Sequence, residues 1–204
     1  MYKYYGKQKY LTAVLPDAEW IYSYSAIQLQ AELNKLFSGK KLKAIYVSLD
    51  GYLEAMHNKV NVIDLSYMGG TALVVFEKTV LQLAIHVEGM FEYRCFPVWE
   101  MKLRENYDYP PEDMVMSDRY FFNVADHEIT YEYNDKTVHS FTVKGTDTWG
   151  FPQPNFDEVI AEEAAQKCDL PGEIILHTNS CDIRFPGDDM EYFWVIFEQA
   201  QKTC

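Results

Sequence analysis

The chain has 204 residues, of which 48% are hydrophobic and 24% are charged, a composition that is typical of a globular domain and excludes a disordered chain. The net charge of −13 lies wholly in the second half, because residues 1–102 carry +1 and residues 103–204 carry −14. Nucleic acid and anionic membranes are therefore excluded as partners, since both require clustered Lys and Arg.

The first clear element in chain order is a helix. Ser25 is a typical N-cap, and Gly39 suits the left-handed position that follows a helix. Apolar residues recur between them with helical spacing, at Leu29, Leu33, Leu36 and Phe37. We expect a helix between Ser25 and Ser38 that buries this face.

A strand-rich block follows the helix. Its apolar runs are separated by short breaks, and such spacing favours antiparallel neighbours because parallel strands need long crossovers. The expected strands are 42–49, 60–65, 71–76, 80–87 and 90–96. In the fourth of them one face is wholly apolar and should be the core side, with Leu81, Leu83, Ile85 and Val87.

Residues 103–118 interrupt this pattern and read as one long connection. Pro110 and Pro111 cannot lie inside a helix or a central strand. We expect residues 1–204 to form a single compact domain with two lobes, 1–102 and 119–204, joined by this acidic segment. Two independent domains are the alternative.

Beyond the connection, the sequence predicts a hairpin and a second helix. The hairpin pairs residues 129–133 with 137–143 around a turn at 134–136. Asn155 is a typical N-cap for a helix that ends at Cys168.

Three more strands are expected near the end of the chain, at 173–178, 181–185 and 192–197. Residues 190–200 also fit a helical face, but their aromatic and β-branched residues favour a strand, with Trp194 and Ile196 buried. The predicted fold class is therefore α+β: a mostly antiparallel, meander-like sheet of eight or more strands with two α-helices.

One weak internal similarity links residues 84–97 with residues 175–186. Each segment has an apolar residue before a His, then a turn, then an Arg that leads into Phe-Pro. Duplication of a hairpin and chance both explain the match. In either case Pro97 and Pro186 are expected to end strands, where the missing N–H costs little.

The cysteines indicate a reducing compartment. No C-x-x-C motif occurs, and the chain has no apolar segment of signal-peptide or membrane-spanning length, so we expect a cytoplasmic protein with free thiols. Arg94 could lower the thiol pKa of Cys95, but a buried structural cysteine is the favoured interpretation. The four cysteines are Cys95, Cys168, Cys181 and Cys204.

No catalytic signature is present, and no metal ligand or cofactor site is assigned. The chain lacks G-x-S-x-G, S-x-x-K, H-E-x-x-H and a phosphate-binding loop. His127 and His139 flank the predicted hairpin, with Asp126 and Glu128 beside His127, but the expected register places His139 opposite Tyr131. A carboxylate- or His-dependent hydrolase is therefore an alternative function, as is a small-molecule binder with an aromatic-lined cavity.

The leading hypothesis is a non-enzymatic cytoplasmic protein that binds a basic protein partner through an acidic, aromatic surface. Tyr is enriched at interfaces, and long loops often carry function. The expected binding residues are Tyr107, Asp108, Tyr109, Glu112, Asp113 and Asp118. In size, acidity and lack of catalytic motifs the chain resembles small bacterial immunity or antitoxin-type proteins, which implies a basic toxin as partner. The sequence leaves the oligomeric state open.

Overall fold

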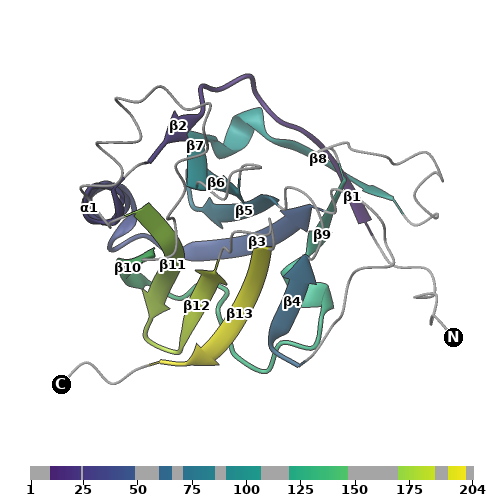
Figure 1. The fold of residues 1–204 in the computed structure, drawn as a ribbon. Helices are drawn as coiled ribbons and strands as arrows, with labels where there is room; N and C mark the ends of the chain where they lie inside the picture. The colour runs from purple at the N-terminus through teal and green to yellow at the C-terminus, as the bar shows by residue number, and fades with distance from the viewer. Residues whose placement is uncertain are drawn as a thin grey trace, which may run out of the picture.

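Two antiparallel sheets and one α-helix make up the part of the chain that the structure, a computed structural model, describes (Figure 1). The described residues are 10–23, 25–48, 60–65, 71–85, 91–106, 120–146, 170–186 and 193–200. The elements of the first half are β1 (Tyr10–Val14), β2 (Ile21–Tyr22), α1 (Ala26–Phe37), β3 (Leu42–Ser48), β4 (Val62–Leu65), β5 (Thr71–Phe76), β6 (Thr79–Ile85), β7 (Phe91–Pro97) and the short 3-10 helix η2 (Val98–Glu100). Those that follow are β8 (Lys102–Asn106), β9 (Tyr120–Asn123), the 3-10 helix η3 (Val124–Asp126), β10 (Val138–Thr146), β11 (Leu170–Thr178), β12 (Cys181–Pro186) and β13 (Phe193–Gln199).

The α+β class and the antiparallel pairing are confirmed, but the single meander is wrong. The eight-stranded sheet has the order β2-β7-β6-β5-β3-β9-β1-β8, and the five-stranded sheet has the order β10-β11-β12-β13-β4. Only β5-β6-β7 and β10-β11-β12-β13 follow chain order. Elsewhere strands far apart in sequence are neighbours: β9 lies between β3 and β1, and β4 completes the five-stranded sheet beside β13.

Two local features differ from the sequence-based expectation, and a third lies outside the described residues. Residues 129–133 form no strand; the side chain of Asn61 instead accepts a hydrogen bond from the backbone N–H of Thr130 (2.7 Å), and β10 pairs with β11. The start of the expected connection 103–118 is also strand, because β8 pairs with β1. The expected helix 155–168 lies outside the described residues.

Strands from both expected lobes occur in both sheets. β9 lies between β3 and β1, and β4 pairs with β13 along the edge of the five-stranded sheet. Residues 107–119 are not among the described residues, so the division of the chain into two lobes stays a prediction.

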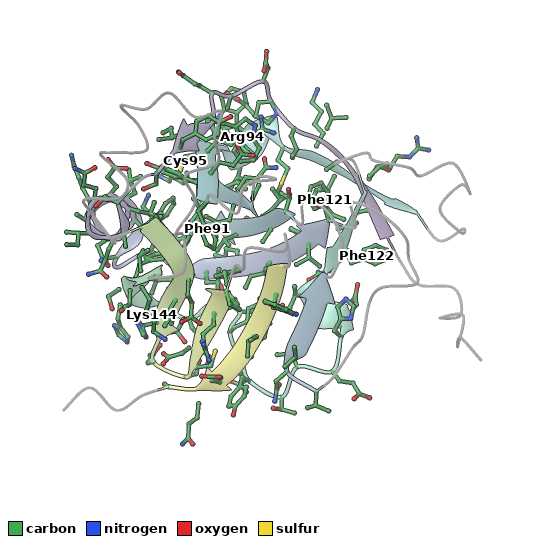
Figure 2. All side chains as sticks on the ribbon, in the orientation of Figure 1. Phe91, Arg94, Cys95, Phe121, Phe122 and Lys144 are labelled. Carbon is green, nitrogen blue, oxygen red and sulfur yellow. The ribbon has the colours of Figure 1, made fainter. Side chains whose placement is uncertain are left out.

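The buried apolar residues form two cores. The main core lies between the two sheets and α1, whereas the second is enclosed by the eight-stranded sheet and the segments next to its strands. Neighbouring residues on one strand enter different cores: on β9, Phe122 belongs to the main core and Phe121 to the second core (Figure 2). The eight-stranded sheet is thus buried on both faces along its central strands.

This arrangement corrects part of the predicted core. Leu29, Leu33, Leu81 and Leu83 are buried as expected, but the opposite face of β6 is buried as well, including Gln82. Leu36 is 41% exposed, because the buried face of α1 runs through Ala26, Leu29, Leu33 and Phe37. Trp194 and Ile196 are only half-buried, since Val195 and Phe197 take the core side of β13. The side chain of Ile85 lies outside the described set.

The helix α1 begins and ends where the sequence predicts, and it protects a sheet edge. The Ser25 hydroxyl accepts from the Gln28 N–H (3.3 Å), and Gly39 has a φ of 83°. Asn34 both donates to and accepts from the backbone of Phe141 on β10, and Gln30 accepts from the Val143 N–H (2.9 Å). These bonds satisfy edge groups of β10 that would otherwise invite pairing with another chain. No described helix is long and apolar enough to span a membrane.

Candidate functional site

The predicted binding residues are all in one segment that the structure does not describe. Tyr107, Asp108, Tyr109, Glu112, Asp113 and Asp118 lie within residues 107–119, outside the described ranges. Their role as a binding surface stays a prediction, and the site built below rests on other residues.

The two histidines considered as a catalytic pair lie in different surroundings. His127 follows η3, and its buried Nε2 atom has no hydrogen-bond partner. Burial lowers the pKa of this imidazole, and the nearby Asp126 carboxylate only partly opposes the effect. His139 is exposed on β10, which pairs with β11 and not with residues 129–133. The hairpin that was expected to set their register is therefore absent.

The polar residues that the fold does bring together lie on one face of the five-stranded sheet. Side chains alternate along its strands: Phe141, Ile174, Ile183 and Val195 enter the main core. The opposite face carries a set of polar side chains that we call the polar face: Thr142, Lys144, Glu173, His177, Asp182, Arg184 and Glu198.

An ion-pair network crosses four strands on the polar face. Glu173, with a side chain only 10% exposed, is the centre: one carboxylate oxygen accepts from Lys144 Nζ (2.6 Å) and the other from the Arg184 guanidinium. Arg184 also donates to Glu198 (2.7 Å). Burial opposes the charge on Arg184, but its hydrogen bonds to Glu198 and Glu173 raise its pKa on balance. Lys144 marks the β10 end of this network in Figure 2.

A second set of hydrogen bonds joins three strands beside the ion pairs. His177 on β11 is directly opposite Asp182 on β12, and its Nδ1 lies 2.9 Å from Asp182 Oδ1. The other ring nitrogen, Nε2, lies 2.8 Å from the hydroxyl oxygen of Thr142 on β10. The Asp182 side chain is 5% exposed and the His177 side chain 25% exposed, so the ring is the member of this set that solvent reaches.

Part of this arrangement was within reach of sequence reasoning. The expected strands 173–178 and 181–185 leave a two-residue turn, and such a turn pairs residue 178 with 181 and residue 177 with 182. The His177–Asp182 pair follows from that register. Thr142 could not be found in this way, because 34 residues separate it from His177 and its pairing depends on how β10 meets β11.

Part of the negative charge of the second half is in ion pairs within the described residues. Glu132, Asp135, Glu173 and Glu198 are each paired with a Lys or Arg. By contrast, the sequences of segments 107–119, 147–169 and 187–192 together contain 13 Asp and Glu residues against two Lys and Arg.

Two of these acidic segments are anchored at the same end of the five-stranded sheet. Segment 147–169 runs from Thr146 to Leu170, which are cross-strand partners, and segment 187–192 runs from Pro186, opposite Glu173, to Phe193. Between them they contain nine Asp and Glu residues and one Lys. The opposite end of the sheet is contacted by residues 128–132, through Asn61 and Ser180.

The remaining chemistry of the described residues is limited. No three His, Cys, Asp or Glu side chains within the described ranges are placed to hold a metal ion. The Cys95 thiol is half-buried, and burial raises its pKa to about 11, which makes it a poor nucleophile. No protein-family model, curated protein or solved structure matches the chain.

Proposed function

We propose that this chain is a binding protein that takes a basic protein partner on an acidic surface. The observation that supports the proposal is the uneven neutralisation of charge in the second half. Glu173 and Glu198 on the five-stranded sheet and Glu132 next to it are in ion pairs, whereas segments 107–119, 147–169 and 187–192 have 13 carboxylates and only two cations in their sequences.

The physical effect of such a charge distribution is on association. A carboxylate in an ion pair has little net electrostatic field, because its partner cancels its charge. A group of carboxylates without cations among them attracts a basic surface over about a Debye length, which is about 10 Å at 0.1 M salt. Complementary charge of this kind raises the association rate and selects partners more than it adds affinity. The end of the five-stranded sheet that anchors segments 147–169 and 187–192 is the expected centre of the surface, and Tyr107–Asp118, which joins β8 to β9 of the other sheet, is a second proposed contact.

The proposal also covers the compartment and the class of partner. It places the protein in the cytoplasm, where Cys95 and Cys181, both free in the structure, stay reduced. A basic toxin, as for immunity or antitoxin-type proteins, is a partner of the required chemistry.

The test compares neutralisation of charge at the two ends of the five-stranded sheet. A partner captured from cell extract is purified, and its association rate is measured for the parent and for two variants with equal changes in net charge. Asp188→Asn with Asp189→Asn alters an acidic segment, whereas Asp126→Asn with Glu128→Asn alters exposed residues near the opposite end.

We expect the first variant to slow association several-fold at about 0.1 M salt and the second to leave it unchanged, with the difference disappearing near 1 M salt. Replacing Asp108, Glu112, Asp113 and Asp118 with Lys should slow association further. Equal rates for the parent and for both acidic-segment variants, or failure to capture any partner at either salt concentration, would overturn the proposal.

A further inference from the structure

Thr142, His177 and Asp182 form a continuous hydrogen-bonded chain that the binding proposal does not use. The Thr142 hydroxyl oxygen lies 2.8 Å from His177 Nε2, and His177 Nδ1 lies 2.9 Å from Asp182 Oδ1. Both distances are within the range for proton transfer between a hydroxyl, a base and its orienting group. The three side chains come from β10, β11 and β12, so three paired strands hold their relative positions.

The direction of these hydrogen bonds follows from the chemistry of the groups. An ionised carboxylate only accepts, so His177 Nδ1 must donate its proton to Asp182. In the neutral ring Nε2 then has no proton, and its lone pair accepts from the Thr142 hydroxyl. The hydroxyl is thereby directed at a base, while the nearly buried Asp182 side chain fixes the tautomer and orientation of the ring.

We propose that Thr142 is a nucleophile for acyl transfer, with His177 as its general base and Asp182 as a positioning residue. The substrate class is an ester of a small carboxylic acid with a good leaving alcohol. The Thr142 hydroxyl lies on a sheet face, so only the part of the ester next to its carbonyl has to contact the protein.

The reaction balances with water as the only co-reactant. Thr142 Oγ1 bonds to the carbonyl carbon as its proton moves to His177 Nε2, and the carbon–oxygen bond to the alcohol breaks as Nε2 returns the proton to the departing oxygen. Water then attacks the threonyl ester, giving a proton to Nε2. The bond from carbon to Oγ1 breaks, Oγ1 recovers the proton, and the carboxylic acid leaves.

The experiment uses p-nitrophenyl acetate with the full chain. Release of p-nitrophenolate is followed by absorbance, and the acetylated residue is located by peptide mass spectrometry after acid quenching. We expect a burst of p-nitrophenolate and an acetyl group on Thr142. Thr142→Val keeps the β-branched shape and should abolish both signals, whereas Thr142→Ser keeps a hydroxyl and should retain them.

The other two residues have distinguishable effects. His177→Gln should lower the rate by roughly 10² to 10⁴, the usual contribution of a general base. Asp182→Asn should lower it and change the pH profile of the burst, which a merely structural role would not do. Two control variants should react as the parent does. His139→Gln removes an exposed imidazole on β10, and Ser140→Ala removes a hydroxyl on the same face of β10 as Thr142.

Thermal unfolding of every variant separates loss of reactivity from loss of fold. Acetylation confined to Lys or Tyr side chains, or an unchanged burst in folded Thr142→Val, would overturn the proposal. Since these variants leave the acidic segments intact, a failure here is independent of the outcome for the basic partner.

Discussion

The β6–β7 and β11–β12 hairpins contain similar sequences but place their arginines in opposite surroundings. Each second strand carries an Arg before Phe-Pro, and β7 and β12 end at Pro97 and Pro186 as expected. Arg94 is buried and donates to the neutral side chain of Gln82 (2.8 Å), with its guanidinium 4.5 Å from the Trp20 ring (Figure 2). Arg184 is part of the ion-pair network on the polar face.

Both arginines point away from the main core, but on β7 that face is covered by the second core, whereas on β12 it is the polar face. One residue in the sequence changes the face of the phenylalanine that follows. Cys95 separates Arg94 from Phe96, so that Arg94 and Phe96 share a face of β7, and the guanidinium lies 5.9 Å from the Phe96 ring. Arg184 directly precedes Phe185, which therefore enters the main core from the opposite face of β12. Because strand side chains alternate, one residue more or less reverses the face of everything beyond it. The sequence similarity thus predicts a hairpin in each place but not a shared environment.

The largest expected effect tests the burial of the β6–β7 hairpin against the main core. Leu83 is fully buried in the main core, and Leu83→Ala should lower the free energy of unfolding by about 2–5 kcal/mol. Leu36→Ala on the 41% exposed position of α1 is the matched control and should cost well under half as much. Urea unfolding of both variants measures the difference. Similar small losses in the two would contradict the burial of this face of β6 in the main core.

A smaller effect is expected from the ion pairs of the β11–β12 hairpin. Glu173→Gln leaves Lys144 and Arg184 without the carboxylate that joins them, and because Glu173 is nearly buried we expect a loss of about 1–3 kcal/mol. Glu198→Gln removes a carboxylate that is 44% exposed and should cost less than about 1 kcal/mol. Chemical denaturation of both variants at low and high salt checks the order. A larger loss for Glu198→Gln would show that burial does not set the strength of these pairs.

The smallest effect concerns the thiol in the β6–β7 hairpin and appears only at alkaline pH. Burial raises the pKa of Cys95 from 9.0 to about 11, so between these values the unfolded chain loses this proton and the folded chain keeps it. The stability due to the neutral thiol is therefore present below pH 9 and is lost as the pH rises toward 11. Unfolding free energies at pH 8 and pH 10.5 should differ less in Cys95→Ala than in the parent. An equal change in unfolding free energy in both proteins would mean that other groups cause the loss of stability at alkaline pH.

Features that depend on neighbours in sequence could be predicted. The Ser25 cap, the left-handed Gly39 and the apolar spacing between them define α1 almost to the residue, because each acts over a single turn. Strand positions in both hairpins and the strand at 193–199 follow from local composition for the same reason. Within the candidate site, the turn after Thr178 is short enough to pair His177 with Asp182.

Features that depend on distant strands were decided by the tertiary structure. Residues 62–65 and 120–123 do not show by themselves which sheet they join. β4 lies at the edge of the five-stranded sheet and β9 in the middle of the eight-stranded one, because the strands beside them are fixed only by the whole fold. Alternation of side chains along β6 predicts one face in the core and one face in solvent. Both faces are buried, because the second core covers the other face. Thr142 meets His177 only because β10 pairs with β11 in one register, and that register depends on hydrogen bonds and burial contributed by the whole sheet.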